Sequence, residues 1–281
     1  AVTRDHLGAP NEAPRPLAAA IEQWLHLGRR TWINLSGREI HGIATARELS
    51  AKTAWEIDTL IDAPEADEHV LGDLLRQAAL AAREALATHL ILRTPLGSPA
   101  AAQAPRAGFR PVVEERLWMG HLDVRPAEEW TVREAEDRDT QARFQVYSRT
   151  LPVAAREAIA MTVEEWEAVQ DYRWVERGGV TLVAEAGGRV VASARCTRGG
   201  QFTLAAEQDA PGAVEALLAA VAEHQEGVED QFALVAAGTP AEDALRRAGL
   251  TPAGEFALFC LRLAHPVRDE AFARASVPIT G

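Results

Sequence analysis

The 281-residue sequence contains few cysteines, one lysine and no long apolar run, and each shortage argues against a class of site or protein. It has two cysteines, Cys196 and Cys260, which lie far apart and fit no metal-ligand spacing. Each lies in an apolar run, so buried, reduced thiols are favoured over a disulfide or a nucleophile. No apolar stretch approaches the roughly 20 residues of a membrane helix, and the N-terminus has no apolar signal-peptide core. We therefore expect a cytoplasmic protein without membrane association.

Basic residues are also scarce. Lysine occurs once, at Lys52, and the formal net charge is −12. Residues 126–281 carry −10 of this charge and residues 1–125 carry −2. Such a surface repels phosphate backbones, so nucleic-acid binding is disfavoured. It could attract a cationic amine, although an acidic surface more often only keeps a protein in solution.

The sequence contains an internal repeat. The stretch 97–109 recurs at 238–250, 141 positions later, and nine residues are identical in a register that continues beyond both stretches. Chance supplies fewer matches than this, so we infer a duplication. We place a first repeat at residues 1–125 and a second repeat at residues 126–281, with the linker within 121–129.

Both repeats predict the same order of elements: a hairpin, a strand, a helix, a strand, a short helix and a last strand. A Gly-[Ser/Thr]-Pro turn begins each short helix, with proline where a missing N–H costs nothing. The expected strands are 31–35, 38–46, 54–61, 89–93 and 112–118, then 180–185, 189–195, 201–206, 231–236 and 256–263. Before the second hairpin we expect a strand at 130–134 and helices at 137–150 and 162–169. Before the first we expect only a helix at 16–27, so the first repeat looks N-terminally shortened.

Several stretches resemble the GNAT superfamily of acetyl-CoA-dependent N-acyltransferases. They are Trp130–Asp139 for its first strand and helix start, Val183–Ala192 for its second and third strands, Trp55–Pro64 for its fourth, and the Arg-Ala-Gly-[Phe/Leu] endings at 106–109 and 247–250. The resemblance implies an α/β fold of two tandem mixed-sheet domains.

The resemblance also implies a site for acetyl-CoA and an amine acceptor of unknown identity. In this superfamily acyl-CoA binds between the fourth and fifth strands, and its pyrophosphate lies on backbone amides at the start of the next helix. The corresponding cofactor contacts here are Ile61 and Leu204 on the fourth strands, and Gly72 and Ala213 at the helix starts.

The phosphate-binding loops depart from the superfamily pattern Arg/Gln-x-x-Gly-x-Gly/Ala. The first repeat places Asp67 and Glu68 in the path of the pyrophosphate, and Pro211 removes one N–H donor from the second. We therefore expect weak acetyl-CoA binding in both repeats. The tyrosine that many members use as general acid is replaced by Ala104 and Leu245.

Glu56 and Asp58 are the candidate catalytic residues, because many members use a glutamate on the fourth strand as general base. A strand alternates its faces, so these carboxylates would share one side while Trp55, Ile57 and Ile61 share the other. Neighbouring carboxylates raise one another's pKa, which suits a base. The alternative is a solvated polar face or pairing with nearby arginines.

Two functions remain open. One is acyl transfer to the amine of a small molecule or a protein, with a working site near Glu56. The other is a non-catalytic relic that binds a small molecule or a protein partner, since a fold alone does not give a function. Trp166, Trp174 and Tyr172 could line an aromatic pocket, although residues at such spacing are more often core.

Overall fold

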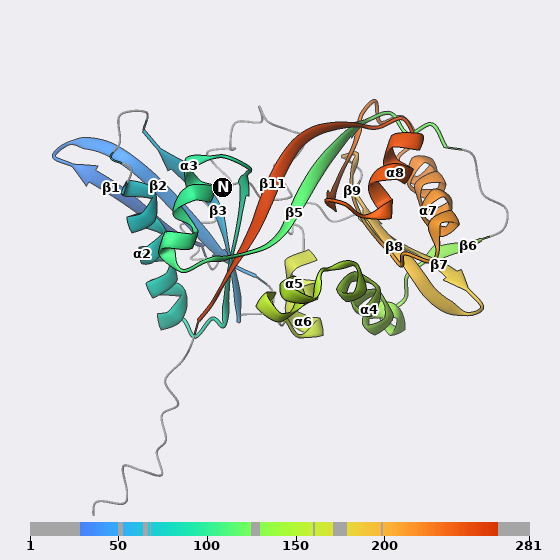
Figure 1. Ribbon diagram of the computed structural model, residues 1–281, viewed down its shortest axis with the longest axis horizontal. Helices are drawn as coiled ribbons and strands as arrows, with labels where there is room; N and C mark the ends of the chain where they lie inside the picture. Colours follow the sequence, from blue (N-terminus) through green and yellow to red (C-terminus); the bar gives the residue numbers. More distant parts are fainter. Residues whose placement is uncertain are drawn as a thin grey trace, which may run out of the picture.

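The computed structural model describes residues 29–49, 53–63, 67, 69–124, 130–159, 161–170, 179–197 and 199–263. Eleven strands form one mixed sheet in the order β1-β2-β3-β4-β11-β5-β10-β9-β8-β7-β6. Figure 1 shows the first repeat at one end of this sheet, the second at the other, and the long strands β5 and β11 crossing the centre. The mixed sheet expected in each repeat is therefore part of one continuous sheet.

The first repeat contains the elements that its pattern predicts. They are β1 (Arg29–Ser36), β2 (Glu39–Glu48), β3 (Ala54–Asp62), α2 (Val70–Glu84), β4 (His89–Pro95), α3 (Pro99–Gln103), η2 (Pro105–Ala107) and β5 (Arg110–Gly120). The Ser98 hydroxyl accepts a hydrogen bond from the Ala101 amide at the start of α3, with Pro99 as the first helical residue. The predicted helix 16–27 lies outside the described residues.

The second repeat begins with elements that precede its hairpin: β6 (Thr131–Glu134), η3 (Asp137–Asp139), α4 (Thr140–Thr150), α5 (Val153–Ile159) and α6 (Val163–Gln170). The remaining elements are β7 (Val180–Ala186), β8 (Arg189–Cys196), β9 (Gln201–Ala206), α7 (Pro211–His224), β10 (Gln231–Ala236), α8 (Pro240–Arg247) and β11 (Thr251–Arg262). The helix α5 is only 7 residues long and was not predicted from the sequence. Helices this short leave little periodic signal.

The last strands of the two repeats are exchanged. β5, from the first repeat, pairs with β10 of the second, and β11, from the second repeat, pairs with β4 of the first. β5 and β11 also pair with each other along their length. Each repeat therefore completes the sheet of the other, a consequence that sequence periodicity does not reveal.

The register of the exchanged strands has the same symmetry as the sequence repeat. Arg110 pairs with Cys260, and Met119 pairs with Thr251, which are equivalent pairs under the 141-residue repeat. The pairs of β10 with β5 and of β4 with β11 obey the same rule. The four central strands thus have approximate two-fold symmetry in their register.

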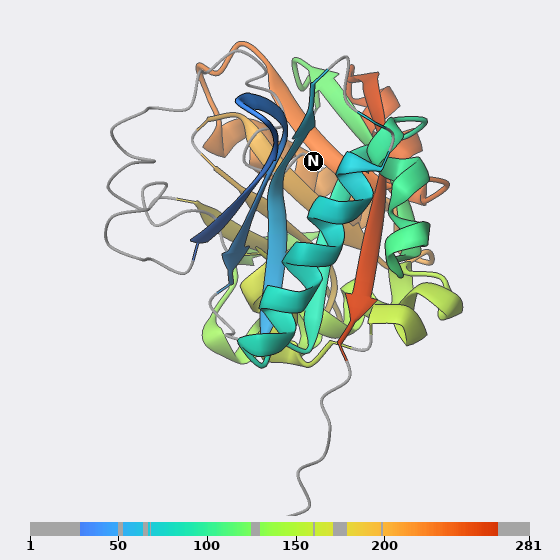
Figure 2. The ribbon, with the colours of Figure 1, turned by 90° about the vertical axis from the view of Figure 1, so that its left-hand side faces the viewer.

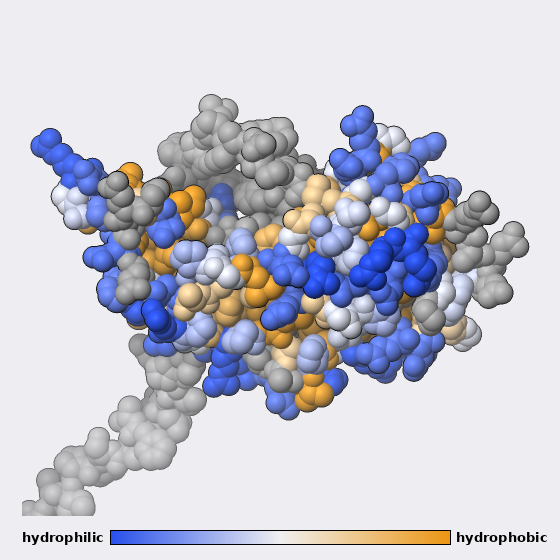
Figure 3. Space-filling model, turned by 45° about the horizontal axis from the view of Figure 1, so that its top comes forward, coloured by the Kyte–Doolittle hydropathy of each residue, from blue (hydrophilic) through white to orange (hydrophobic). Residues whose placement is uncertain are grey.

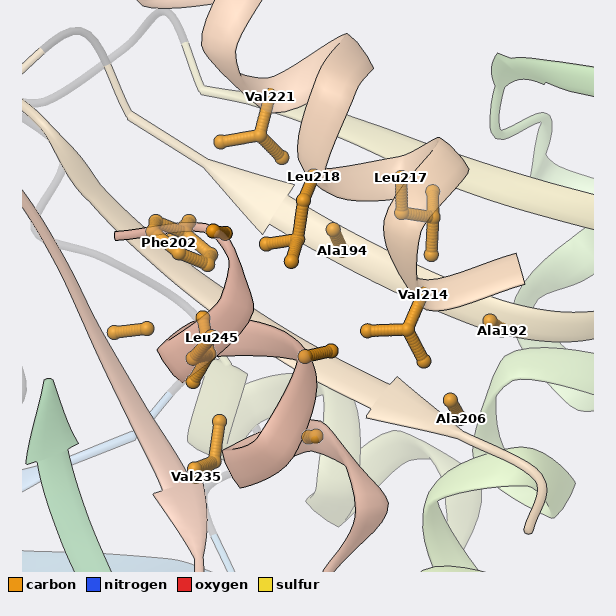
Figure 4. Close-up of a cluster of buried hydrophobic side chains, with 14 of the residues drawn as sticks. Ala192, Ala194, Phe202, Ala206, Val214, Leu217, Leu218, Val221, Val235 and Leu245 are labelled. Atoms are coloured by element: carbon orange, nitrogen blue, oxygen red, sulfur yellow. The ribbon is translucent and has the colours of Figure 1, made fainter. Parts of the chain in front are cut away.

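The helices cover both faces of the sheet. α2 and α3 in the first repeat and α7 and α8 in the second pack on one face, and α4–α6 pack on the other, below the centre in Figure 1. Figure 2 shows α2 in front of the first-repeat strands, with β11 beside it. Figure 4 shows the second-repeat core, where α7 and α8 contact the small and apolar residues of β8, β9 and β10.

Both repeats end their short helix on a glycine. Gly108 and Gly249 have φ values of 89° and 94°, a left-handed conformation that favours glycine. A Cβ atom on Gly249 would also approach the His121 carbonyl oxygen at 3.0 Å. These glycines correspond to the Arg-Ala-Gly endings on which the repeat was identified.

Strict alternation misplaces one residue of β3. Trp55 and Ile57 join the core against α2 as predicted, but the next residue of that face is Leu60, and Ile61 is 57% exposed. The pairing of β2 with β3 shifts by one residue near Asp58, which marks a β-bulge. An inserted residue reverses the phase of the strand beyond it, so Ile61 leaves the core face.

The side chains on the surface drawn in Figure 3 are mostly hydrophilic, as the many charged residues of the sequence suggest, and hydrophobic ones occur in small groups. Cys196 and Cys260 are buried free thiols, as expected, and burial raises the pKa of Cys196 to about 11 and that of Cys260 to about 12. Among the described residues, no helix is long and apolar enough to span a membrane.

Candidate functional site

Glu56 and Asp58 lie on the sheet face opposite α2, and both are buried. Arg47 donates two hydrogen bonds to Glu56 Oε2, from Nε at 3.1 Å and from Nη2 at 2.7 Å. Arg29 and Thr45 donate hydrogen bonds to the two oxygens of Asp58. Each carboxylate thus has an arginine partner, which is one of the alternatives that the sequence left open.

A second buried ion pair lies beside the first. Arg93 on β4 is 2% exposed, and its Nε donates to Glu115 Oε2 on β5 at 2.5 Å. Its Nη1 is 3.8 Å from Glu56 Oε1. Burial alone would lower the pKa of Arg93, but the charges of Glu115 and Glu56 raise it above its ordinary value. Arg47, Glu56, Arg93 and Glu115 therefore form one row of alternating charge from the first repeat to the exchanged strand.

The fourth and fifth strands of each repeat separate part-way along their length. β3 pairs with β4 only from Ala54 to Ile57 although β3 continues to Asp62. β9 pairs with β10 only from Gln201 to Thr203 although β9 continues to Ala206. A helix follows each separated strand, α2 in the first repeat and α7 in the second. Both repeats thus have an open notch followed by a helix N-terminus.

The predicted cofactor contacts lie around these notches. Ile61 is exposed near the end of β3, and Leu204 is half-buried directly after the last paired residue of β9. Gly72 and Ala213 are buried in the first turns of α2 and α7. Nothing in the geometry tests their role in binding, which stays a prediction.

The two helix starts differ in charge. The first turn of α2 contains Asp73, and Asp67 is exposed just before it. The first turn of α7 contains no acidic residue. The small Gly212 is required there, because a Cβ atom on it would come within 2.6 Å of the Trp130 indole nitrogen. Since phosphates favour a helix start without carboxylates, α7 fits a pyrophosphate better than α2. Glu68 lies outside the described residues.

A cavity of about 60 Å³ opens at the second-repeat notch, on the α4 face of the sheet. Its walls come from α4, α6 and the strands β5, β7, β8, β9 and β10. β9 contributes Thr203, Leu204 and Ala205, the residues at which the strand leaves its partner. The cavity therefore lies against the notch where the strands separate.

The exchanged strand brings a carboxylate to this cavity. Glu115 on β5 is part of the lining, and β5 pairs at this position with Ala236 of β10. The second repeat has no carboxylate in 201–206, as the sequence analysis noted. Sequence reasoning missed Glu115 because the exchange is not visible in the sequence. The available signal was the pair Glu114 and Glu115 within the predicted strand 112–118.

Cationic and aromatic side chains also line the cavity. Arg143 and Tyr147 on α4, Trp166 on α6 and Arg195 on β8 all line it. For Trp166 the sequence left a pocket or a core position open; the residue is buried and also lines this cavity. Its two predicted partners, Trp174 and Tyr172, lie outside the described residues. At the positions of the superfamily's acid, Ala104 and Leu245 are fully buried in the cores.

Comparisons with known proteins support the architecture. No protein-family model matches the sequence, and no curated protein gives a significant match. A GCN5-related N-acetyltransferase from Sphaerobacter thermophilus is 16% identical, with a TM-score of 0.56 over 91% of this chain and 88% of that one. A functionally unknown conserved protein from Staphylococcus epidermidis is 11% identical, with a TM-score of 0.56 over 86% and 98% of the two chains. At these identities the matches show the fold alone, and it is the fold that the resemblance predicts.

Proposed function

We propose that this chain, which has the GCN5-related N-acetyltransferase fold, is an acyl-CoA-dependent N-acyltransferase with its working site in the second repeat. One observation carries the proposal: the cavity opens where β9 and β10 separate, and it contains the carboxylate of Glu115. The notch and the helix start after it suit binding of acyl-CoA, and the cavity on the other face of the sheet suits binding of the acceptor. The acyl group would then be transferred at the notch, where the two sites meet.

The chain's residues fit acyl-CoA better in the second repeat than in the first. Leu204 at the separated strand and the first turn of α7 would hold it, with no acidic residue in that turn. In the first repeat Asp67 and Asp73 oppose phosphates. Bound acyl-CoA would supply an acyl group activated as a thioester.

Glu115 is our candidate for the group that accepts a proton from the acceptor amine. An amine attacks only as its neutral form, so a carboxylate beside the acceptor can serve as the base that accepts the proton lost by the nitrogen. Arg93 fixes the orientation of Glu115 through the hydrogen bond at 2.5 Å. Arg93 is thus a positioning residue, and Glu56 at 3.8 Å supports it in turn.

The catalytic role of Glu56 and Asp58 that the sequence suggested stays a proposal for the first repeat. Both are held by arginines, and neither lines the cavity of the second repeat. Glu115 also accepts two hydrogen bonds, both from Arg93, so hydrogen bonding does not separate the two candidates. Glu115 lines the second-repeat cavity and Glu56 does not, and on that ground we favour Glu115 as the base.

The second candidate function is a non-catalytic binding module. Two observations favour it: Ala104 and Leu245 replace the superfamily's acid, and Glu115 is engaged by Arg93. A thiolate leaving group can depart without an acid, so the first observation does not exclude catalysis. An assay that follows release of free CoA decides between the two functions.

The test is acetyl transfer from acetyl-CoA to a panel of primary amines, followed by thiol release. We expect turnover in wild type and a loss of roughly 10²–10⁴-fold in kcat for Glu115→Gln. Glu56→Gln serves as the matched control, because it removes a buried carboxylate from the same charge row outside the cavity. If Glu56→Gln loses the activity and Glu115→Gln keeps it, the working site is in the first repeat. If no amine yields turnover, the binding-module function takes its place.

A further inference from the structure

We infer that the acceptor carries a carboxylate as well as its amine, and that Arg143 and Arg195 bind this carboxylate in the second-repeat cavity. The inference rests on the proposed function and specifies the substrate class of the same site. It is carried by the contacts of Arg143, by the presence of Arg143 and Arg195 in the lining of one cavity, and by Glu115 in the same lining.

Arg143 is buried, and its guanidinium is only partly satisfied by the residues around it. The residue is 9% exposed, and its Nε has no hydrogen-bond partner among the described residues. The carboxylate paired with it is that of Glu167, whose Oε1 is 3.8 Å from Nη1, and the Glu167 side chain is 47% exposed. A buried charged donor left unpaired is costly, so it marks a place where a ligand can supply the acceptor.

Arg195 on β8 lines the same cavity. Burial lowers the pKa of Arg143, Glu167 opposes that shift, and the positive charge of Arg195 lowers it further. The positive charges of Arg143 and Arg195 repel one another, and an anion near both guanidinium groups would reduce that repulsion. A planar carboxylate matches the fork of guanidinium donors.

Trp166 holds the Arg143 guanidinium in place. The Arg143 Cζ lies 5.4 Å from the centre of the Trp166 ring, a cation–π contact. Phe144 and Tyr147 pack on the same ring at centroid distances of 5.7 Å. A guanidinium fixed before the ligand arrives loses less entropy on binding, which strengthens recognition.

The lining of the cavity therefore contains charged groups of both signs. α4 and β8 contribute Arg143 and Arg195, whereas β5 contributes Glu115, which already has Arg93 as its partner. An acceptor with an amine and a carboxylate would place the amine toward Glu115 and the carboxylate toward the two arginines. The acidic charge of the second repeat suggested a cationic amine as the acceptor. The two arginines in the cavity favour instead an acceptor that carries a carboxylate as well.

The experiment measures ligand binding without acetyl-CoA, so it does not depend on turnover. Full-length protein is titrated by calorimetry and thermal shift with the twenty common L-amino acids and with the amines that lack their carboxylates. Variants are Arg143→Gln, Arg195→Gln and, as a matched control, Arg149→Gln, which removes an exposed arginine from the same helix α4. Circular dichroism checks that each variant is folded.

We expect at least one amino acid to bind at least 10-fold more tightly than its decarboxylated amine. Arg143→Gln and Arg195→Gln should each weaken that binding about 10-fold or more, as expected for loss of a charge-assisted hydrogen bond, and Arg149→Gln should leave it unchanged. Equal binding of the decarboxylated amines, or no binding of any amino acid, would overturn the inference. Turnover of a simple amine without amino-acid binding would leave the proposed function standing and remove this inference alone.

Discussion

Glu115 of β5 and Phe256 of β11 face one another at the centre of the sheet, and they occupy equivalent positions of the two repeats. Glu115 lies beside β10 and lines the second-repeat cavity. Phe256 pairs with Pro95 of β4 in the first repeat. The equivalent place in the first repeat therefore has a phenyl ring where the second has a carboxylate. This asymmetry is a structural reason to expect one working site in a duplicated fold.

The strand exchange predicts that neither repeat folds alone. A fragment of residues 1–125 would leave β4 and β5 without β11 between them, and residues 126–281 would leave β10 without β5. Unpaired central strands expose backbone groups and apolar residues, which promotes aggregation. We expect each fragment to be insoluble when expressed alone and the two to co-purify when co-expressed. A monomeric residue 1–125 fragment with a cooperative thermal transition would show that the exchange is dispensable.

Arg93 should be important for stability because its guanidinium contacts both Glu56 and Glu115. Arg93→Met leaves two buried carboxylates without this partner, and we expect a loss of about 3–5 kcal/mol in the free energy of unfolding. The double variant Arg93→Met/Glu115→Gln should recover part of that loss. Urea denaturation of the three proteins measures both effects. Equal stability of Arg93→Met and wild type would contradict the buried charge row.

Asp139 forms an ion pair that should make the free energy of unfolding depend on pH. Its hydrogen bonds from Arg133, at 2.6 and 3.0 Å, lower its pKa to about 2, and the Glu136 amide contributes in the same direction. Because the folded pKa is below the unfolded value, this stability is present above about pH 4 and is lost as the pH falls toward 2.

The measurement for Asp139 compares wild type with Asp139→Asn from pH 7 to pH 2. The difference in unfolding free energy should be largest near neutrality and should vanish at the acidic end. Asp137→Asn, an exposed neighbour in the same short helix, serves as the control. A difference that does not change with pH would contradict the ion pair.

Much of the fold could be predicted because it is encoded locally. Alternation and helical spacing gave the strands and the longer helices, and the turn glycines Gly108 and Gly249 marked the ends of the short helices. The exchange of β5 and β11 could not be predicted, because both strands suit either neighbour and the choice depends on tertiary pairing. The bulge near Asp58 was missed for a related reason: alternation carries no sign of an inserted residue.

The candidate site was predicted less well. The notch and the helix starts followed from the resemblance, but the cavity residues come from strands and helices that are distant in sequence. Glu115 and Arg143 are 28 positions apart in the chain and belong to different repeats. Single charged residues within apolar or helical patterns were the available signals, and without the pairing of the strands they could not be placed together.

The most direct test of the central claim is calorimetric titration of acetyl-CoA into the full-length protein. We expect one site per chain, in the second repeat, with a dissociation constant for acetyl-CoA of about 10 µM to 1 mM. The binding should be weak because Pro211 removes one amide donor. Leu204→Glu, which places a carboxylate at the second-repeat notch, should abolish the binding, and Ile61→Glu at the first-repeat notch should leave it unchanged. No binding at millimolar acetyl-CoA, or binding that is lost in Ile61→Glu and kept in Leu204→Glu, would contradict the account.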